Sequence, residues 1–196
     1  VADVKLCIDA IGDYLTSIEL FKEYGSNYEL YKHPSVFTIK ELLDFCATEH
    51  GSKEAFAYQT RKQEISISFT EFKAQVNAWG TYLFNEGYRD CHIAVFGENS
   101  YEWILTHFAV TCGGNVIVPI DKELDADTIA ELLSDSESKV LVYSNTYADI
   151  AEQLQAKLPD LTYINMKETA ACINIGKRLI ENGHTDYINK EIDKEQ

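Results

Sequence analysis

Apolar residues recur every three or four positions in the first part of the chain, and this spacing is typical of one face of an amphipathic helix. The helix is predicted to end near Gly25. We assign residues 1–35 to an N-terminal helical extension, which either packs on the main core or presents its apolar face to a partner or a second copy. The apolar positions of this face are Val4, Ile8, Ile11, Leu15, Ile18 and Phe21.

A capping box and a pair of strands come next. Thr38 and Glu41 have the capping-box spacing, which predicts a helix over residues 39–49. Residues 54–59 and 64–68 are rich in β-formers and flank a short polar stretch, so they predict a β-hairpin.

A second capping box, made by Ser68 and Glu71, starts a longer helix that Gly87 can end. One face of this helix is apolar and largely aromatic. We interpret that stripe as core packing in preference to a surface that stacks on a cofactor. Its members are Phe69, Phe72, Val76, Trp79 and Leu83.

From His92 onward, predicted strands alternate with predicted helices, which favours a parallel sheet flanked by helices on both faces. The fold class is therefore α/β, with a small β-hairpin and the N-terminal helical extension. We expect Asn99 to cap the first of these helices and either Asp125 or Asp127 to cap the second. The strands are predicted at 92–96, 115–120, 139–143 and 161–165, and the first, third and fourth helices at 100–111, 146–157 and 168–181.

The last predicted helix is expected to bury Cys172, Ile175 and Leu179. We divide the rest of the chain into an α/β part at residues 36–184 and a charged segment at residues 185–196. That segment shows no core contribution of its own and resembles a linker. The chain begins at Val1, without an initiator Met, which suggests a processed or truncated form of a longer protein.

Charge narrows the choice of partners. Seventeen basic and 32 acidic residues give a net charge of −15 in 196 residues, and no basic stripe offsets it. Nucleic acid and anionic membrane surfaces are poor partners for such a surface. No stretch approaches the ~20 apolar residues that span a bilayer, so no transmembrane segment is predicted.

The cysteines and histidines form no recognisable site. The five cysteines contain no C-x-x-C pair, so a disulfide framework or a zinc site is not expected, and a reducing cytoplasm fits best. We predict that Cys46, Cys112 and Cys172 are buried, inert thiols. The five histidines are scattered, and His107 is expected to be partly buried with its hydrogen bonds satisfied.

Open parallel sheets bind ligands beyond the carboxyl ends of their strands. This rule places Gly97, Glu98, Asn99, Asp121 and Ser144 on one rim. Neither of the strongest glycine-rich phosphate motifs occurs, and the alternating carboxylates that begin at Asp121 lack the features of a calcium loop. The residues alone therefore indicate an α/β domain with a ligand-facing rim and no visible catalytic or metal centre.

Several short motifs nevertheless resemble those of the adenylate-forming superfamily, which includes acyl-CoA synthetases, luciferases and the adenylation domains of peptide synthetases. The motifs occur in the family's order. Residues 65–72 resemble its "(L/I)TYxEL" opening, residues 98–103 its "N-S-x-E-W" helix start, and residues 113–121 its "G-x-x-x-V-P-(L/I)-(D/N)" strand. Residues 121–124, Gly176, Gly183 and the pair Ile192-Asp193 resemble the long-chain fatty acid branch. The turn at residues 88–91 departs from the family's "K-x-G-D", and we expect the fold to be unaffected.

The resemblance implies a parent enzyme that uses ATP and Mg²⁺ to form an acyl-adenylate and then transfers the acyl group of a fatty acid to coenzyme A. The phosphate loop and the C-terminal lid of that family are absent from the sequence. We therefore assign no catalytic, cofactor-binding or metal-binding residue, and we expect the chain alone to be inactive and to need the remainder of its parent. A stand-alone module that binds a nucleotide or acyl group, and an interaction protein that uses the N-terminal helix, are the alternatives.

Overall fold

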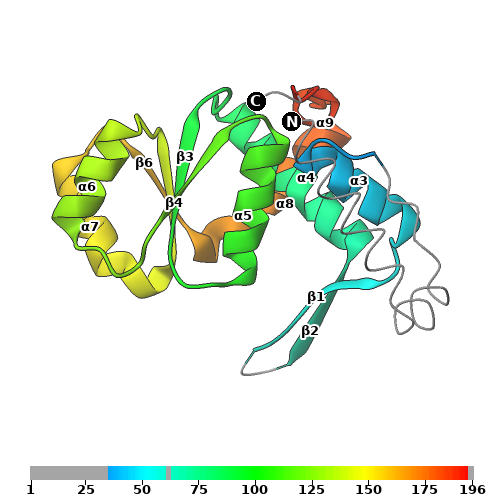
Figure 1. The fold of residues 1–196 in the computed structure, drawn as a ribbon, viewed down its shortest axis with the longest axis horizontal. Coiled ribbons are helices and arrows are strands. Elements are labelled where there is room, and N and C mark those ends of the chain that lie inside the picture. Colours follow the sequence, from blue (N-terminus) through cyan, green and yellow to red (C-terminus); the bar gives the residue numbers. More distant parts are fainter. Residues whose placement is uncertain (1–34, 61–62, 194–196) are drawn as a thin grey trace, which may run out of the picture. The chain divides into compact units, whose positions relative to one another are not determined.

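The computed structural model describes residues 35–60 and 63–193 (Figure 1). The chain divides into two units, Val1–Ser35 and Val36–Gln196, and all the helices and strands named here belong to the second. The amphipathic helix predicted between Val4 and Phe21 lies outside the described residues.

The first described elements confirm the capping signals. Helix α3 (Ile39–Glu49) starts at Thr38, whose hydroxyl accepts a hydrogen bond from the Glu41 N–H at 3.1 Å. The hairpin consists of β1 (Glu54–Gln59) and β2 (Glu64–Ser68), which pair antiparallel.

Helix α4 (Phe69–Asn85) begins with a complete capping box, since Ser68 and Glu71 bond reciprocally. Four of the five residues of its predicted stripe lie in the core, since Phe72, Val76, Trp79 and Leu83 are all at most 2% exposed. The fifth, Phe69, is only half-buried. The position of α4 between the hairpin and the sheet makes it the main packing partner of helices α3, α5 and α8.

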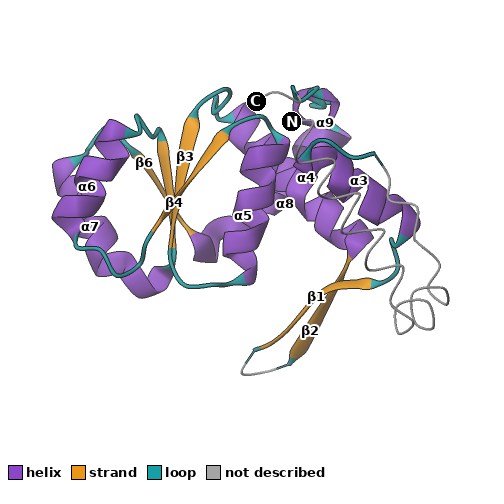
Figure 2. Cartoon of the chain, in the orientation of Figure 1, coloured by secondary structure: helices purple, strands orange, loops and turns teal. Residues whose placement is uncertain are grey.

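The main sheet is parallel and has the strand order β4-β3-β5-β6. Figure 2 shows its strands in orange, between helices drawn in purple. Its strands are β3 (His92–Phe96), β4 (Val116–Ile120), β5 (Val140–Tyr143) and β6 (Thr162–Asn165). All the pairings are parallel, as the alternating pattern predicted, and the central β3 pairs with both β4 and β5. The strand order is a feature that local sequence signals did not supply.

Helices cover both faces of this sheet (Figure 1). On one face, Ala94, Phe96 and Leu141 pack against α6 (Ala126–Asp135) and α7 (Ala148–Lys157). On the other face, Ile93 and Val142 belong to a larger core with α4, α5 (Tyr101–Cys112) and α8 (Thr169–Glu181). The near-continuous apolar strands reflect this burial on two sides. Two 3₁₀ turns, at Asn145–Tyr147 and Met166–Glu168, lead into α7 and α8.

Three expectations about individual helix residues were wrong. Ser100, and not Asn99, caps α5, because its hydroxyl accepts from the Trp103 N–H at 3.2 Å. Ile173, and not Ile175, faces the core: Ile173 is 7% exposed and Ile175 is 38% exposed. Leu179, which was also expected to be buried, is only half-buried. Asp125 caps α6, one of the two alternatives given.

The expectation that residues 185–196 contribute nothing to the core was also wrong. Helix α9 (Asp186–Asn189) inserts Tyr187, which is 1% exposed, beside α4 and α5. The Tyr187 hydroxyl donates to the Ala109 carbonyl at 2.9 Å, and its ring packs edge-on against Phe84 with centroids 5.1 Å apart. A single aromatic side chain therefore anchors a segment whose composition is otherwise charged.

Backbone carbonyls of this C-terminal segment are held by Lys40 of α3. Its ammonium group donates to the carbonyls of Tyr187 at 3.2 Å, Ile188 at 2.8 Å and Lys190 at 2.6 Å. Burial lowers the pKa of Lys40, although the carboxylate of Asp44 opposes this effect. The contacts satisfy the open end of a one-turn helix, since a lysine side chain can bond the last carbonyls.

The turn at residues 88–91 leaves the fold intact, as expected. The buried side chain of Asn115 accepts from the Cys91 N–H at 3.0 Å and donates to the Tyr88 carbonyl at 3.1 Å. The same turn contacts the C-terminal segment through an ion pair between Arg89 and Asp186 at 3.0 Å.

Candidate functional site

The strand order places a crevice between β3 and β5 at their carboxyl ends. The chain leaves β3 toward β4 on one side and leaves β5 toward β6 on the other, so the connections diverge between the two strands. Such a switch point is where open α/β sheets bind ligands. The rim predicted from sequence lies here in part, because Gly97, Glu98 and Ser144 come together.

Close approach of the two loops requires a glycine. The Ser144 N–H donates to the Phe96 carbonyl at 2.8 Å and continues the strand pairing by one residue. A Cβ atom on Gly97 would lie 2.6 Å from the Cβ of Ser144, which is too close for any larger residue without a shift. Gly97 therefore lets the β3 and β5 loops meet.

Glu98 occupies the space beside this contact. Its Oε1 atom accepts from the Thr146 hydroxyl at 2.9 Å, and its Oε2 atom is buried without a hydrogen-bond partner among the described residues. Burial raises the pKa of Glu98, but its own N–H, the hydroxyls of Ser144 and Thr146, and the charge of Lys122 lower it further than burial raises it. The side chain therefore carries a negative charge at neutral pH.

The neighbouring loops are bonded mainly to one another. Buried Asn165, at the end of β6, donates to the Asn145 side chain at 3.0 Å and accepts from the Lys167 N–H at 3.0 Å. The hydroxyl of Ser100 lies 3.9 Å from the sulfur of Met166. Ser100, Asn145, Met166 and Lys167 line a shallow hollow of about 290 Å³ together with Glu98.

The other two rim residues predicted from sequence follow the carboxyl ends of β4 and β3 but do not line the hollow. Asp121 is exposed and accepts from the Glu123 N–H at 3.0 Å within its own turn, and Asn99 is also exposed. The sequence did not identify Thr146, Asn145 and Met166, because they follow β5 and β6, whose positions in the sheet depend on the crossovers.

The cysteines and His107 match the predictions only in part. Cys112 and Cys172 are buried thiols, and burial raises the pKa of Cys112 to about 12, whereas Cys46 is only half-buried. His107 is partly buried and stacks on Trp103 with centroids 5.7 Å apart. Its Nδ1 atom has no hydrogen-bond partner in the described part of the chain, so the expectation of satisfied bonds was wrong.

Residues 35–60 and 63–193 contain no group of three or more histidine, cysteine, aspartate or glutamate side chains that could hold a metal ion. It also contains no helix long and apolar enough to cross a membrane.

The rim is a poor match for a triphosphate. Phosphate sites in α/β folds use several free N–H groups and a cationic side chain. Lys167 lines the hollow and is a cation, but Glu98 and Glu102 line it as well, and the Ser100 hydroxyl already accepts from one N–H of the α5 N-terminus.

The doubly wound architecture and its motifs define an α/β domain of the kind that carries nucleotide-dependent enzymes. The family model described as "AMP-binding enzyme" matches residues 43–190. The chain belongs to the AMP-binding enzyme family.

Similar proteins include both acyl-CoA ligases and peptide synthetases. The polyketide synthase-nonribosomal peptide synthetase ffsA of Aspergillus flavipes is 27% identical over 140 residues, which are 70% of this chain and 3% of that protein. The mitochondrial medium-chain acyl-CoA ligase ACSF2 of Pongo abelii is 23% identical over 152 residues, with 68% of this chain and 24% of that protein covered. The chain thus spans a small part of the curated relatives it matches.

A solved structure shows the same fold. The N-terminal domain of FACL13 from Mycobacterium tuberculosis matches with a TM-score of 0.63 at 23% identity, over 70% of this chain and 36% of that chain. The sheet and its flanking helices are therefore a recurring part of a larger N-terminal domain.

Proposed function

We propose that this chain is the N-terminal part of an ATP-dependent acyl-CoA synthetase, which forms an acyl-adenylate and then a thioester with coenzyme A. The observation that carries the proposal is the family match over residues 43–190. Fatty acids are the proposed substrates, since the names of several relatives with the same fold or sequence pattern specify acyl-CoA ligases. ATP, Mg²⁺ and coenzyme A are the corresponding cofactors of the parent, and the cytoplasm is its proposed location.

Within that enzyme, the described residues act as a scaffold. Two observations support this role: the rim hydrogen bonds are used between its own loops, and the carboxylate of Glu98 disfavours a phosphate group in the hollow. We propose that residues 36–184 form the α/β part, that residues 1–35 form a separate extension, and that the chain alone does not catalyse adenylation.

The test is ATP–pyrophosphate exchange with a panel of fatty acids and amino acids. The 196-residue chain is compared with the longest translation product of its gene. Exchange that depends on a fatty acid and occurs only with the longer product is the expected result. Exchange that depends on an amino acid would move the enzyme to the peptide-synthetase branch, and exchange by the 196-residue chain itself would contradict the scaffold role.

A binding measurement tests the scaffold role separately. Calorimetric titration of the 196-residue chain with ATP and Mg²⁺ should show no micromolar binding. Micromolar binding would support the alternative of a stand-alone nucleotide-binding module.

A further inference from the structure

The C-terminal end of α8 carries the one asparagine-glycine pair of the 196-residue sequence, Asn182-Gly183. Both residues are exposed, and they connect α8 to the C-terminal segment that Tyr187 anchors. The backbone nitrogen that follows an asparagine can attack the side-chain amide, and a glycine allows this reaction best because it has no Cβ to hinder the approach. The sequence therefore marks Asn182 as a residue that can lose its amide group.

The folded end of α8 holds this pair in a geometry that does not react. The Gly183 N–H donates to the Ile180 carbonyl at 2.9 Å. Gly183 has a φ of 92°, which is the left-handed conformation of a glycine that ends a helix. At Asn182 a ψ of 9° nearly eclipses the Gly183 nitrogen with the Asn182 nitrogen, so the Gly183 nitrogen is turned away from the side-chain amide. The attacking atom is thus both hydrogen-bonded and misplaced.

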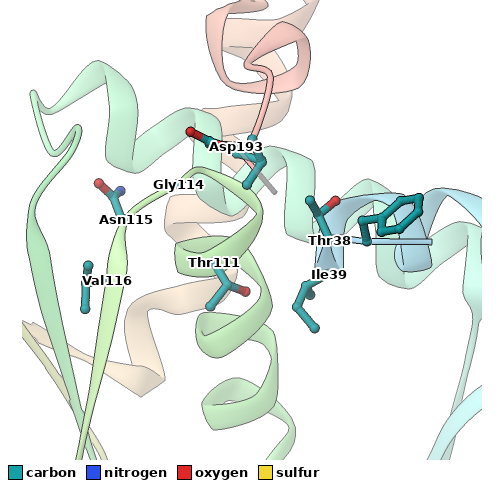
Figure 3. Close-up of a pocket in the computed structure, with 9 residues that line it drawn as sticks. Thr38, Ile39, Thr111, Gly114, Asn115, Val116 and Asp193 are labelled. Carbon is teal, nitrogen blue, oxygen red and sulfur yellow. The ribbon is translucent and has the colours of Figure 1, made fainter. Parts of the chain in front are cut away.

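The C-terminal segment opposes the rotation that would bring the two groups together. A change in ψ at Asn182 displaces the residues that follow, and Tyr187, which is 1% exposed, is separated from Asn182 only by residues 183–186. Further along the segment, Asp193 and Gly114 line one hollow, where Figure 3 shows them together. A short connection between fixed points cannot absorb such a rotation. Ring closure at Asn182 therefore requires the local release of Tyr187 from the core.

We infer that Asn182 is a deamidation site that the anchored ring of Tyr187 keeps closed. On release, the Gly183 nitrogen attacks Cγ of Asn182. A new N–Cγ bond forms, the Cγ–Nδ2 bond breaks, and the side-chain nitrogen leaves as ammonia with the proton of the Gly183 N–H. Water then opens the succinimide ring at either carbonyl. This step restores the Gly183 N–H, leaves aspartate or isoaspartate at residue 182, and releases one proton to solvent; no atom is oxidised or reduced.

The reaction makes the release of the C-terminal segment permanent. The product places a new carboxylate at the C-terminal end of α8, where the helix dipole disfavours an anion. Glu181 beside it adds to the negative charge, and Arg178 in the last turn offsets only part of it. Isoaspartate also adds one carbon atom to the main chain between α8 and Tyr187. Since the ammonia is lost to solvent, the original asparagine does not re-form.

The experiment measures the conversion of Asn182 by peptide mapping and mass spectrometry while the 196-residue chain is incubated at mildly alkaline pH. Tyr187→Ala removes the anchor and should accelerate the conversion at least several-fold. Tyr187→Phe is the matched control, because it keeps the ring in place and should convert almost as slowly as the unchanged chain. Lys40→Met removes the hydrogen bonds to the carbonyls of Tyr187, Ile188 and Lys190 and should give an intermediate rate.

A second asparagine reports on the rest of the fold. Asn99 is exposed, precedes Ser100 at the start of α5 and should convert at the same rate in every folded variant. If Tyr187→Ala accelerates Asn99 as well as Asn182, the whole chain has unfolded, and Lys40→Met then decides the question because it must accelerate Asn182 alone.

Three results would overturn the inference. Equal rates at Asn182 in the unchanged chain and in the deciding variant, with Asn99 unaffected, would remove the role of the anchor. Conversion of Asn182 no faster than that of Asn99 in concentrated urea would remove the site itself. The amide of Asn189, which bonds to the Thr185 carbonyl at 2.9 Å, should exchange hydrogen faster after conversion, and unchanged exchange would refute the permanent release.

Discussion

The buried ring of Tyr187 gives the sharpest test of the packing described above. Gly80 of α4 faces this ring, and a Cβ atom on Gly80 would lie 2.0 Å from the Tyr187 Cε2 and Cζ atoms. Because the ring is 1% exposed and its hydroxyl is bonded to the Ala109 carbonyl, it has no free space to move into. The change Gly80→Ala should therefore force a clash.

Whether Gly80→Ala lowers or raises the free energy of unfolding depends on the presence of the Tyr187 ring. Overpacking a core costs about 1–3 kcal/mol, and an overlap this deep belongs at the upper end. Alanine gains about 1 kcal/mol over glycine inside a helix, so Gly80→Ala should destabilise the chain by about 2 kcal/mol. In a Tyr187→Ala background, itself about 3–5 kcal/mol less stable, the clash is gone and Gly80→Ala should stabilise by up to about 1 kcal/mol. The two sites are thus coupled by about 3 kcal/mol.

Urea unfolding followed by tryptophan fluorescence measures this cycle, with Trp79 in the same helix as Gly80. At a urea dependence of about 2 kcal/mol/M, the Gly80→Ala midpoint should fall by about 1 M. The control is Tyr187→Phe, which keeps the ring and removes only the hydroxyl, so Gly80→Ala must remain destabilising in that background. A Gly80→Ala effect that is the same with and without the Tyr187 ring would refute the packing argument.

Three further predictions concern a helix cap, a carboxylate and a thiol. Ser68→Ala removes half of the α4 capping box and should lower the free energy of unfolding in urea by about 1 kcal/mol, and an unchanged midpoint would refute that role. Because the folded-state pKa of Glu98 is lowered from 4.5, its stabilising contribution is present above that pH and is lost on acidification. Glu98→Gln should therefore weaken the dependence of the free energy of unfolding on pH below about 4.5, and Thr146→Val should weaken it in part. If the free energy of unfolding falls with acid in both variants as it does in the unchanged chain, the role of Glu98 is refuted. Burial raises the pKa of Cys112 to about 12, so iodoacetamide should alkylate native Cys112 far more slowly than half-buried Cys46 by peptide mapping, and equal rates would contradict its burial.

Local signals in the sequence predicted most of the elements. The capping box of Ser68 and Glu71 and the aromatic stripe behind it specify α4 within a few residues, because capping and helical periodicity are both local properties. The same reasoning failed where two nearby residues were equally good candidates for one role. Asn99 and Ser100 are both good caps, and Ile173 and Ile175 both fit an apolar helix, so the tertiary contacts decided which was used.

The contacts of Tyr187 show a second reason why the sequence did not predict part of the fold. Composition marked residues 185–196 as a linker, because charged residues surround a single tyrosine. The decisive information lies far away in the sequence, in the missing side chain of Gly80 and in the carbonyl of Ala109. A glycine in a helix normally weakens it, and only the fold shows that this one makes room for an aromatic ring.

The rim shows why its hydrogen bonding could not be derived from the chain alone. Glu98 and Thr146 follow different strands, and they meet because β5 crosses back to pair with β3 on the side opposite β4. Each strand was predictable from its apolar residues, but the order of strands depends on the path of the crossover and is not encoded in either segment. Once β3 and β5 are adjacent, Gly97 permits the loops to touch, and Glu98 bonds across them to Thr146. The carboxylate of Glu98 thereby faces the same hollow as Ser100, the cap of α5, so the charge at this switch point follows from the strand order and not from either segment alone.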